Sequence, residues 1–257
     1  MSLSRVTLLT DFGTRDGYAA AMRGVIAAIA PDVLVEDASH DIPPGDVFCA
    51  AWTLARYWNL FPPGTKHVVV VDPGVGSSRR AVVVEADGRQ LVAPDNGVLT
   101  NVLLEAQRYR AFEIANSAML RHPIAPTFHG RDVLAPVAAH LANGMSIELV
   151  GPPINDLVTL ETPVPRRDGD VIHGRVLMSD RFGNLITNIP GAWVPAHARI
   201  EIGGIPIGPL RTTYTDALPG APLALVGSLD LLEISIRDGS AAETLSMGKG
   251  SIVRIVQ

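Results

Sequence analysis

The first 150 residues alternate short β-branched runs with longer runs in which small and apolar side chains recur at helical spacing. The strand-like runs cover residues 5–11, 33–39, 67–72, 81–86 and 89–94, and the helix-like runs cover 17–30, 46–60, 97–109 and 131–144. Alternation of this kind predicts βαβ units around a largely parallel central sheet. Residues Val68–Val71 are apolar throughout, as expected of a central strand that is buried on both faces.

The pattern changes in the last third of the chain. Residues 156–169 are rich in proline and turn formers and lack an amphipathic period, which predicts a linker. Six short strand-like runs follow, separated by Gly, Pro and Asp; they cover 174–180, 184–189, 198–204, 222–228, 231–236 and 251–257. Their spacing predicts a small antiparallel β-barrel. We therefore expect an α/β N-terminal domain at 1–155, a linker at 156–169 and a C-terminal β-barrel domain at 170–257.

Composition and charge narrow the range of partners. Of the 257 residues, 47% are hydrophobic and 18% charged, which is typical of a compact globular protein. The formal net charge is −5 without any block of like charge, so the sequence favours a small-molecule substrate over nucleic acid or an anionic membrane. The chain starts without a recognisable secretory signal and has no apolar run long enough to span a bilayer, which predicts a cytoplasmic protein. The single cysteine, Cys49, is expected to pack in the interior.

Two aspartates follow strand-like runs, at positions where α/β sheets usually bind ligands. Asp11 lies in TDFGTRDG (10–17) and Asp72 in VDPGVGSSRR (71–80). The carboxyl ends of parallel strands meet at one crevice, so both side chains are expected there. The tripeptide DFG also occurs in protein kinases, but the HRD and Gly-rich loops of a kinase are absent from this sequence. Asp11 either caps a local turn or accepts hydrogen bonds from a ribose diol, and its spacing leaves both open.

The stretch VDPGVGSSRR places a carboxylate and a guanidinium around a turn. It lacks the third glycine of a dinucleotide fingerprint and the Gly-Lys-Ser/Thr of a P-loop, so a phosphate-binding loop is not predicted. Pro73 and the glycines account for the turn itself. A buried Asp72 also needs a charged or hydrogen-bonding partner, which Arg79 can supply. From this stretch alone, the pair is either a structural ion pair or part of a catalytic site.

Two further loops contain titratable side chains. His129, in PTFHGRD (126–132), immediately precedes a helix-like run, where an imidazole is functional, structural or simply solvated. In EDASHDIPPGD (36–46), Asp37, His40 and Asp41 could form a metal site, although the prolines and the irregular spacing favour a capped loop. A metal-dependent hydrolase built on these three residues is kept only as a competing hypothesis.

Two strand ends in the second domain are unusually polar. Phe182 and Asn184, two positions apart in SDRFGNLITNI (179–189), could present a ring and an amide to one ligand, or could fill the core and hold a turn. Ser228 and Glu233 flank the start of another strand-like run in the same way.

Six stretches in chain order together resemble the S-adenosyl-L-methionine (SAM) hydroxide adenosyltransferases, also called adenosine-forming SAM hydrolases, which are relatives of the fluorinases and chlorinases. These stretches are TDFGTRDG, VDPGVGSSRR, PDNGVLT, PTFHGRD, SDRFGNLITNI and GSLDLLEISI. The resemblance covers nearly the whole chain. It implies an α/β domain followed by a β-barrel domain, a homotrimer with active sites between one subunit's N-domain and a neighbour's C-domain, and no metal or organic cofactor. The implied reaction is attack of water at the ribose C5′ of SAM, giving adenosine and L-methionine.

The resemblance also implies roles for individual residues. The Asp, Arg and His that hold and polarise the attacking water in that family match Asp72, Arg79 and His129. The implied substrate contacts are Asp11 on the ribose hydroxyls, Asp180, Phe182 and Asn184 around ribose and base, Ser228 and Glu233 near the methionine and adenine portions, and backbone groups near Ile236 and Asp238 at the adenine edge.

Two alternatives remain within this resemblance. A halogenase would use chloride to make 5′-halo-5′-deoxyadenosine, but the halogenating relatives carry a tyrosine where Asp72 stands. The fluorinase also has a long insertion where this chain has only EADGRQ (85–90). A non-catalytic protein that binds SAM or adenosine would have no need of Asp72, Arg79 and His129 together. These three observations favour the hydrolase.

Overall fold

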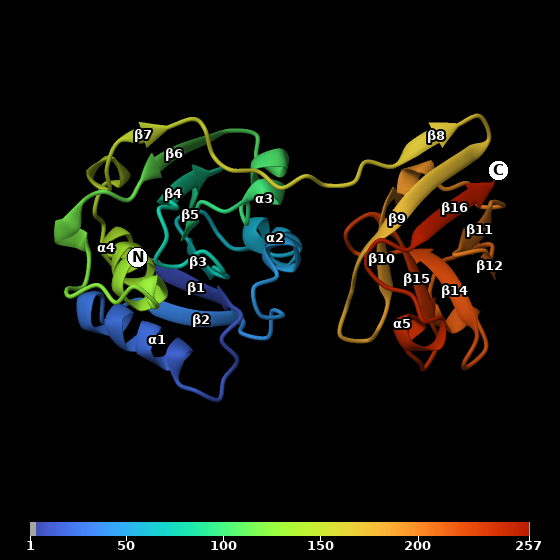
Figure 1. The fold of residues 1–257 in the computed structure, drawn as a ribbon, viewed down its shortest axis with the longest axis horizontal. Coiled ribbons are helices and arrows are strands. Elements are labelled where there is room, and N and C mark those ends of the chain that lie inside the picture. Colours follow the sequence, from blue (N-terminus) through green and yellow to red (C-terminus); the bar gives the residue numbers. More distant parts are fainter. Residues whose placement is uncertain (1–3, 257) are drawn as a thin grey trace. The chain divides into compact units, whose positions relative to one another are not determined.

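The computed structural model describes residues 4–256, which divide into two compact units (Figure 1). The division falls between Leu160 and Glu161, inside the segment 156–169 where the sequence predicts a linker. Each unit has a hydrophobic core of its own and is described by itself. No helix within residues 4–256 is both long enough and apolar enough to cross a membrane.

The first unit is built on one mixed sheet of seven strands in the order β2-β1-β3-β5-β4-β6-β7. The strands are β1 (Arg5–Thr10), β2 (Leu34–Ser39), β3 (Lys66–Val70), β4 (Ala81–Ala86), β5 (Arg89–Pro94), β6 (Tyr109–Glu113) and β7 (Pro153–Ile154). Strands β2, β1, β3 and β5 are mutually parallel, which confirms the predicted α/β domain. Strands β4, β6 and β7 extend the sheet in antiparallel fashion. The tight turn at Asp87 and Gly88, both with positive φ, returns β5 directly beside β4.

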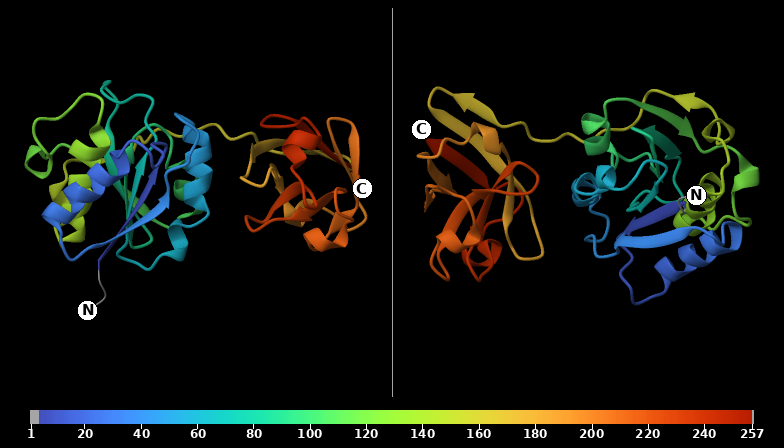
Figure 2. Two further views of the ribbon diagram at one scale, coloured as in Figure 1. Left: turned by 90° about the horizontal axis from the view of Figure 1, so that it is seen from below. Right: turned by 180° about the vertical axis from the view of Figure 1, so that it is seen from behind.

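Helices cover both faces of this sheet. They are α1 (Tyr18–Ile29), α2 (Val47–Ala55), α3 (Thr100–Glu105) and α4 (Ala135–Ala142), with short helical turns η1 (Trp58–Leu60), η2 (Ser117–Met119), η3 (Gly130–Leu134, a π-helix) and η4 (Ile147–Leu149). Val68 and Val70 of β3 point into the core under α1 and α4, whereas Val69 points into the core under α2 and α3. The views in Figure 2 show α1 and α4 on one side of the sheet and α2 on the other. The uniformly apolar strand is therefore buried on both faces, as predicted.

One predicted element differs from the structure. The sequence predicts a helix over 97–109, but α3 ends at Glu105 and a strand, β6, begins at Tyr109. The five residues of β6 show no clear alternation, and only two of them, Ala111 and Phe112, are buried. Their strand conformation comes from pairing with β4, where Val83 is opposite Phe112. A tertiary partner determines this element more than its own sequence.

The second unit is a curled sheet of nine strands, which confirms the predicted β-barrel. Its order is β12-β11-β16-β9-β10-β15-β14-β13, with β8 beside β9. The strands are β8 (Arg166–Asp168), β9 (Val171–Ser179), β10 (Leu185–Pro190), β11 (Arg199–Ile202), β12 (Ile205–Gly208), β13 (Leu210–Arg211), β14 (Pro222–Val226), β15 (Leu231–Ile236) and β16 (Ile252–Val256). All neighbours are antiparallel except β13 and β14, and β12 contacts β14 so that the sheet nearly closes. The helical turns are η5 (Gly191–Trp193), η6 (Tyr214–Asp216) and the short helix α5 (Ala241–Thr244).

Candidate active site

The connection between β3 and β4 folds Arg79 back over Asp72. Its first turn is closed by a hydrogen bond from the Val75 N–H to the Asp72 carbonyl at 3.2 Å, and Pro73 supplies the φ that this turn requires. Arg79 Nε then donates to both carboxylate oxygens of Asp72, at 3.0 and 2.9 Å, and Nη2 donates to Oδ2 as well. The side chains of Asp72 and Arg79 are only 4% and 11% exposed, so this pair is largely desolvated. Charge-assisted bonds in such surroundings fix both groups firmly.

His129 joins this pair from a second loop. Arg79 Nη2 lies 3.0 Å from His129 Nδ1, and a guanidinium can only donate hydrogen bonds. Nδ1 therefore accepts, and the proton of the neutral imidazole lies on Nε2. Burial lowers the pKa of His129, and the positive charge of Arg79 lowers it further, against smaller opposing effects of Asp72 and Asp132. The imidazole is thus held neutral, with its Nε2–H available as a donor.

The two loops touch at a glycine. Gly76 has φ +79°, and a Cβ at this position would lie 2.5 Å from the carbonyl oxygen of Pro126, three residues before His129. Only glycine fits this contact, both because of its conformation and because of the space. The sequence motif VDPGVGSSRR thus contains the residue that lets its turn approach the loop of His129.

The His129 loop is held at its base by Asp132. This fully buried carboxylate accepts hydrogen bonds from the Arg121 side chain and the Ala125 N–H, each at 2.9 Å, and from Arg131 at 2.7 Å. Burial raises the pKa of Asp132, but these hydrogen bonds outweigh burial and bring it to about 2. Asp132 therefore remains charged and organises the loop.

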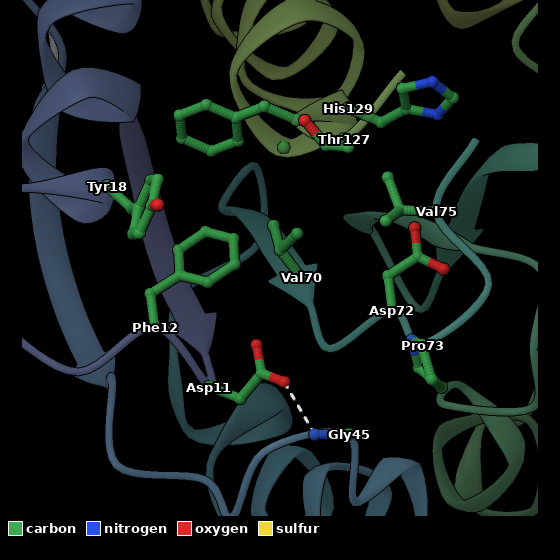
Figure 3. Close-up of a pocket in the computed structure, with 12 residues that line it drawn as sticks. Asp11, Phe12, Tyr18, Gly45, Val70, Asp72, Pro73, Val75, Thr127 and His129 are labelled. Atoms are coloured by element: carbon green, nitrogen blue, oxygen red, sulfur yellow. Dashed lines mark hydrogen bonds between the residues drawn. The ribbon is translucent and has the colours of Figure 1, made fainter. Parts of the chain in front are cut away.

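A cavity of about 350 Å³ opens beside these groups (Figure 3). Asp11, Asp72 and His129 line it together with Phe12, Tyr18, Gly45, Val70, Pro73, Val75, Thr127, Phe128 and Gly130. Asp11 Oδ2 accepts a hydrogen bond from the Gly45 N–H at 2.8 Å. Arg79 is not one of the lining residues, so it holds Asp72 and His129 from behind the cavity wall.

Three aromatic rings form one wall of this cavity and were not singled out in the sequence. Phe12, Tyr18 and Phe128 contact one another pairwise, with ring centroids 5.2 to 5.7 Å apart. Phe12 directly follows Asp11, and Phe128 directly precedes His129. Their position next to predicted site residues was the only sequence signal that could have identified them. Single aromatic residues are usually core residues, so the sequence alone did not separate them from the interior.

The C-terminal unit has a cavity of its own, of about 590 Å³. Four predicted binding residues line it: Phe182, Asn184, Ile236 and Asp238. Phe182 is 76% exposed, whereas Asn184 is buried. Sequence reasoning missed the other lining residues, which are Tyr214, Thr215, Arg237 and Gly239. An exposed ring beside a buried amide suits a planar ligand that has a hydrogen-bonding edge.

Asp180, Glu233 and Ser228 do not line this cavity. Asp180 accepts hydrogen bonds from the N–H groups of Phe182 and Asn184, both at 2.9 Å, and thus shapes the turn that presents them. Buried Glu233 accepts from the Tyr214 hydroxyl at 2.7 Å; burial and this carboxylate raise the pKa of Tyr214 to about 12. Ser228 is exposed in the turn between β14 and β15. Asp180 and Glu233 thus support residues that line the cavity.

The structure brings together only two of the three candidate metal ligands. His40 is buried, with Nδ1 2.8 Å from the Thr10 hydroxyl and Nε2 3.1 Å from Asp37, which also pairs with Arg23 at 3.1 Å. Asp41 is exposed. Over residues 4–256 the structure contains no group of three or more His, Cys, Asp or Glu side chains that could hold a metal ion.

This chain is similar to known proteins in both sequence and fold. Residues 6–151 match the family described as SAM hydroxide adenosyltransferase N-terminal domain, and residues 174–254 match the corresponding C-terminal domain. The chain is 40% identical to a protein of Thermus thermophilus named (R)-S-adenosyl-L-methionine hydrolase, over 98% of this chain and 99% of that protein. It is 27% identical to a protein of an Actinoplanes species named fluorinase, over 98% and 97% of the two chains. A solved structure from Thermotoga maritima, described as an uncharacterized conserved protein, superposes with a TM-score of 0.92 at 34% identity, covering 98% of this chain and 100% of that one.

Proposed function

The chain belongs to the SAM hydroxide adenosyltransferase family, and on this premise we propose that it hydrolyses SAM to adenosine and L-methionine. The observation that carries the proposal is the contact of Arg79 with both Asp72 and His129 at the wall of the N-terminal cavity. Because similar proteins are named (R)-S-adenosyl-L-methionine hydrolase, we propose that the substrate of this chain is the SAM epimer with the (R) configuration at sulfur.

The chemistry of the substrate fits this cluster. The leaving group is a sulfonium that becomes a neutral thioether, so the reaction needs no general acid. Catalysis must instead act on the nucleophile, by holding one water molecule in line with the C5′–S bond and by excluding others. A carboxylate that accepts and an N–H that donates are the two contacts that orient such a water.

The roles follow from the hydrogen-bond directions. In our proposal Asp72 accepts a hydrogen bond from the water, and the Nε2–H of His129 donates one to the water oxygen. Arg79 contacts both side chains and is a positioning residue. As the O–C5′ bond forms, the C5′–S bond breaks, its electron pair remains on sulfur, and the proton of the water leaves through Asp72 to solvent.

The remaining site residues would bind the nucleoside and the sulfonium. Asp11 would accept hydrogen bonds from the ribose hydroxyls. Phe182, Asn184 and the backbone near Ile236 and Asp238 would hold the base. Asp180 and Glu233 would act through the residues they support, and Ser228 would contact the methionine portion. The carboxylates and the aromatic wall of the N-terminal cavity also suit a cation, because ring faces attract positive charge.

Three further parts of the proposal concern assembly, cofactors and location. We propose a homotrimer in which one subunit's N-terminal cavity and a neighbour's C-terminal cavity bind the same substrate. We also propose that the reaction uses no metal or organic cofactor, so a chelator should leave the rate unchanged. A cytoplasmic location remains the expectation from the sequence.

The test is to incubate the protein with each sulfur epimer of SAM, with and without chloride or fluoride, and to identify the products by chromatography. Adenosine and methionine, formed from the (R) epimer and unaffected by halide or chelator, support the proposal. A 5′-halo-5′-deoxyadenosine would instead identify a halogenase. Saturable binding without any product would identify a sensor.

Two matched substitutions test the roles. Asp72→Asn and His129→Ala should each lower kcat by about a hundredfold or more, because each removes one contact to the water, while the affinity for adenosine stays nearly unchanged. Asp32→Asn and His197→Ala alter exposed side chains and serve as controls. Full activity in either site variant would refute the assigned role.

A further inference from the structure

The segment 36–46 contains titratable residues that the proposed mechanism does not use. His40 is only 4% exposed, and its two ring nitrogens face different partners. Nδ1 lies 2.8 Å from the Thr10 hydroxyl, and Nε2 lies 3.1 Å from Asp37 Oδ1. Thr10 is the last residue of β1 and directly precedes Asp11 and Phe12, which line the cavity.

The hydrogen-bond directions connect His40 to the backbone of the cavity wall. The Phe12 N–H donates to Thr10 Oγ1 at 3.2 Å. The Thr10 hydroxyl hydrogen then satisfies both groups when it is donated to His40 Nδ1, which places the imidazole proton on Nε2. Nε2 lies 3.1 Å from Asp37 Oδ1 but makes no well-aligned hydrogen bond with it, so this end of the chain is an electrostatic contact. Asp37 is in turn paired with Arg23 of α1 at 3.1 Å. Asp37, His40 and Thr10 thus form a chain of polar contacts, the positioning relay, that ends on the amide of Phe12.

Two backbone contacts join the same pair of loops. The Gly13 N–H donates to the His40 carbonyl at 2.8 Å. The Gly45 N–H donates to the Asp11 carboxylate at 2.8 Å, as Figure 3 shows. Gly13 and Gly45 both have positive φ, which allows each loop to bend toward the other. The turn 10–13 is therefore held on one side by the relay and on the other by the loop 40–45.

We infer that the positioning relay fixes Asp11 and Phe12 in the geometry that binds the ribose, so that His40 and Thr10 are positioning residues for substrate. This inference rests on the proposed role of Asp11. Neither His40 nor Thr10 lines the cavity, so both act through the backbone of residues 11–13. Loss of the relay should therefore weaken nucleoside binding more than it slows the chemical step at Asp72 and His129.

The test uses the full-length protein with Thr10→Val and His40→Ala, which remove the two partners of the central hydrogen bond. Each should raise the calorimetric Kd for adenosine and the KM for SAM about tenfold while kcat changes less than about threefold. His40→Asn should recover most of the affinity, because its amide can occupy the place of Nδ1. Asp41→Asn, on the exposed neighbour of His40, should have no effect.

The Asp37→Asn variant distinguishes weaker adenosine binding through the relay from a general folding defect. This isosteric change at the partly exposed end of the relay should preserve the fold, as judged by circular dichroism, and still raise the Kd. The relay is refuted if the variants lose only thermal stability, if kcat and KM change equally, or if His40→Asn binds no better than His40→Ala. Failure of the proposed function looks different: the wild-type protein would not turn over SAM, whereas adenosine calorimetry on all variants would still report on the relay.

Discussion

At the residue scale, the Arg79 guanidinium determines the protonation pattern around the proposed water. It occupies Nδ1 of His129, and burial together with its charge lowers the pKa of that imidazole. Protonation of His129 would replace the acceptor at Nδ1 with a second donor facing Arg79, and would break the cluster.

This arrangement predicts a particular pH profile. Because the pKa of His129 is lowered below the usual value of about 6.5, the neutral form persists in the folded protein at pH values where a free histidine is already protonated. The midpoint of the acidic limb of kcat/KM should therefore lie below about pH 6.5. A profile of kcat/KM against pH checks this expectation, and an acidic limb with its midpoint at or above about 6.5 would contradict it.

A second histidine affects stability. His67 is buried, with Nδ1 2.8 Å from the Thr7 hydroxyl and Nε2 3.1 Å from the Trp58 carbonyl. Burial, and to a smaller extent the charge of Arg89, lower its pKa from 6.5 to about 4, although the Trp58 carbonyl opposes this.

The unfolded chain therefore binds a proton at His67 before the folded one does, and stability falls as the pH drops from about 6.5 toward 4. Between about pH 7.5 and pH 5 this residue alone should remove about 2 kcal/mol from the free energy of unfolding. Urea denaturation of wild type and His67→Gln at both pH values measures the difference. An equal pH dependence in the two proteins would show that His67 is not responsible.

Some of these residues were predictable and others were not. The residue types and turns made Asp72, Arg79 and His129 candidates but left structural roles equally open, and only the resemblance of six stretches to a known family selected the three together. Tyr214 carried no such signal, since its place in the cavity depends on a hydrogen bond to Glu233, nineteen residues away in sequence.

At the element scale, the β3–β4 connection is positioned by Gly76. Ala at this residue would have to adopt φ +79° and would meet the Pro126 carbonyl. Gly76→Ala should therefore cost about 1–3 kcal/mol of stability and, by moving the turn away from His129, lower kcat more than it raises KM.

Gly74 in the same turn provides the control. A Cβ there would make only ordinary contacts, the closest at 3.5 Å from Ser77 Oγ. Thermal unfolding and steady-state kinetics of Gly76→Ala and Gly74→Ala should separate the two positions. Similar behaviour of both variants would mean that the contact with Pro126 does not position the cluster.

Helices and strands were predictable where burial of one or both faces produces a regular pattern of apolar residues in the sequence. Strands β1 and β3, which are rich in β-branched and apolar residues and buried on both faces, and the amphipathic α1 were evident from the sequence. Strand β6 was not, because β4 determines its conformation across the sheet. The contact between the turn 71–80 and the loop 126–129 could not be predicted either, because local sequence patterns do not show which distant segments meet.

At the scale of the whole molecule, both cavities leave aromatic rings open to solvent. Tyr18 of the N-terminal cavity is 49% exposed and Phe182 of the C-terminal cavity is 76% exposed. Uncovered rings of this size are typical of surfaces that bind ligands or other subunits. They are consistent with the proposed trimer.

If the trimer forms the site, activity depends on concentration. Light scattering should give a mass of three times the 27.2 kDa chain, and activity per chain should fall on dilution below the dissociation constant of the trimer. Phe182→Ala should lower adenosine affinity without changing the mass. A monomer with undiminished activity at high dilution would rule out a shared site.

Asp72 and Arg79 both lie on a single connection of ten residues, 71–80, between two strands that are not at an edge of the sheet. The strands on either side are fixed by their own packing, so side chains of this connection other than Gly76 can change without disturbing the sheet. In the proposed mechanism, the carboxylate that contacts the attacking water therefore lies on a different connection from Asp11, which is assigned to the ribose. Exchange of this connection between relatives, together with the loop of His129, would show whether the attacking group can be changed while the nucleoside is still bound.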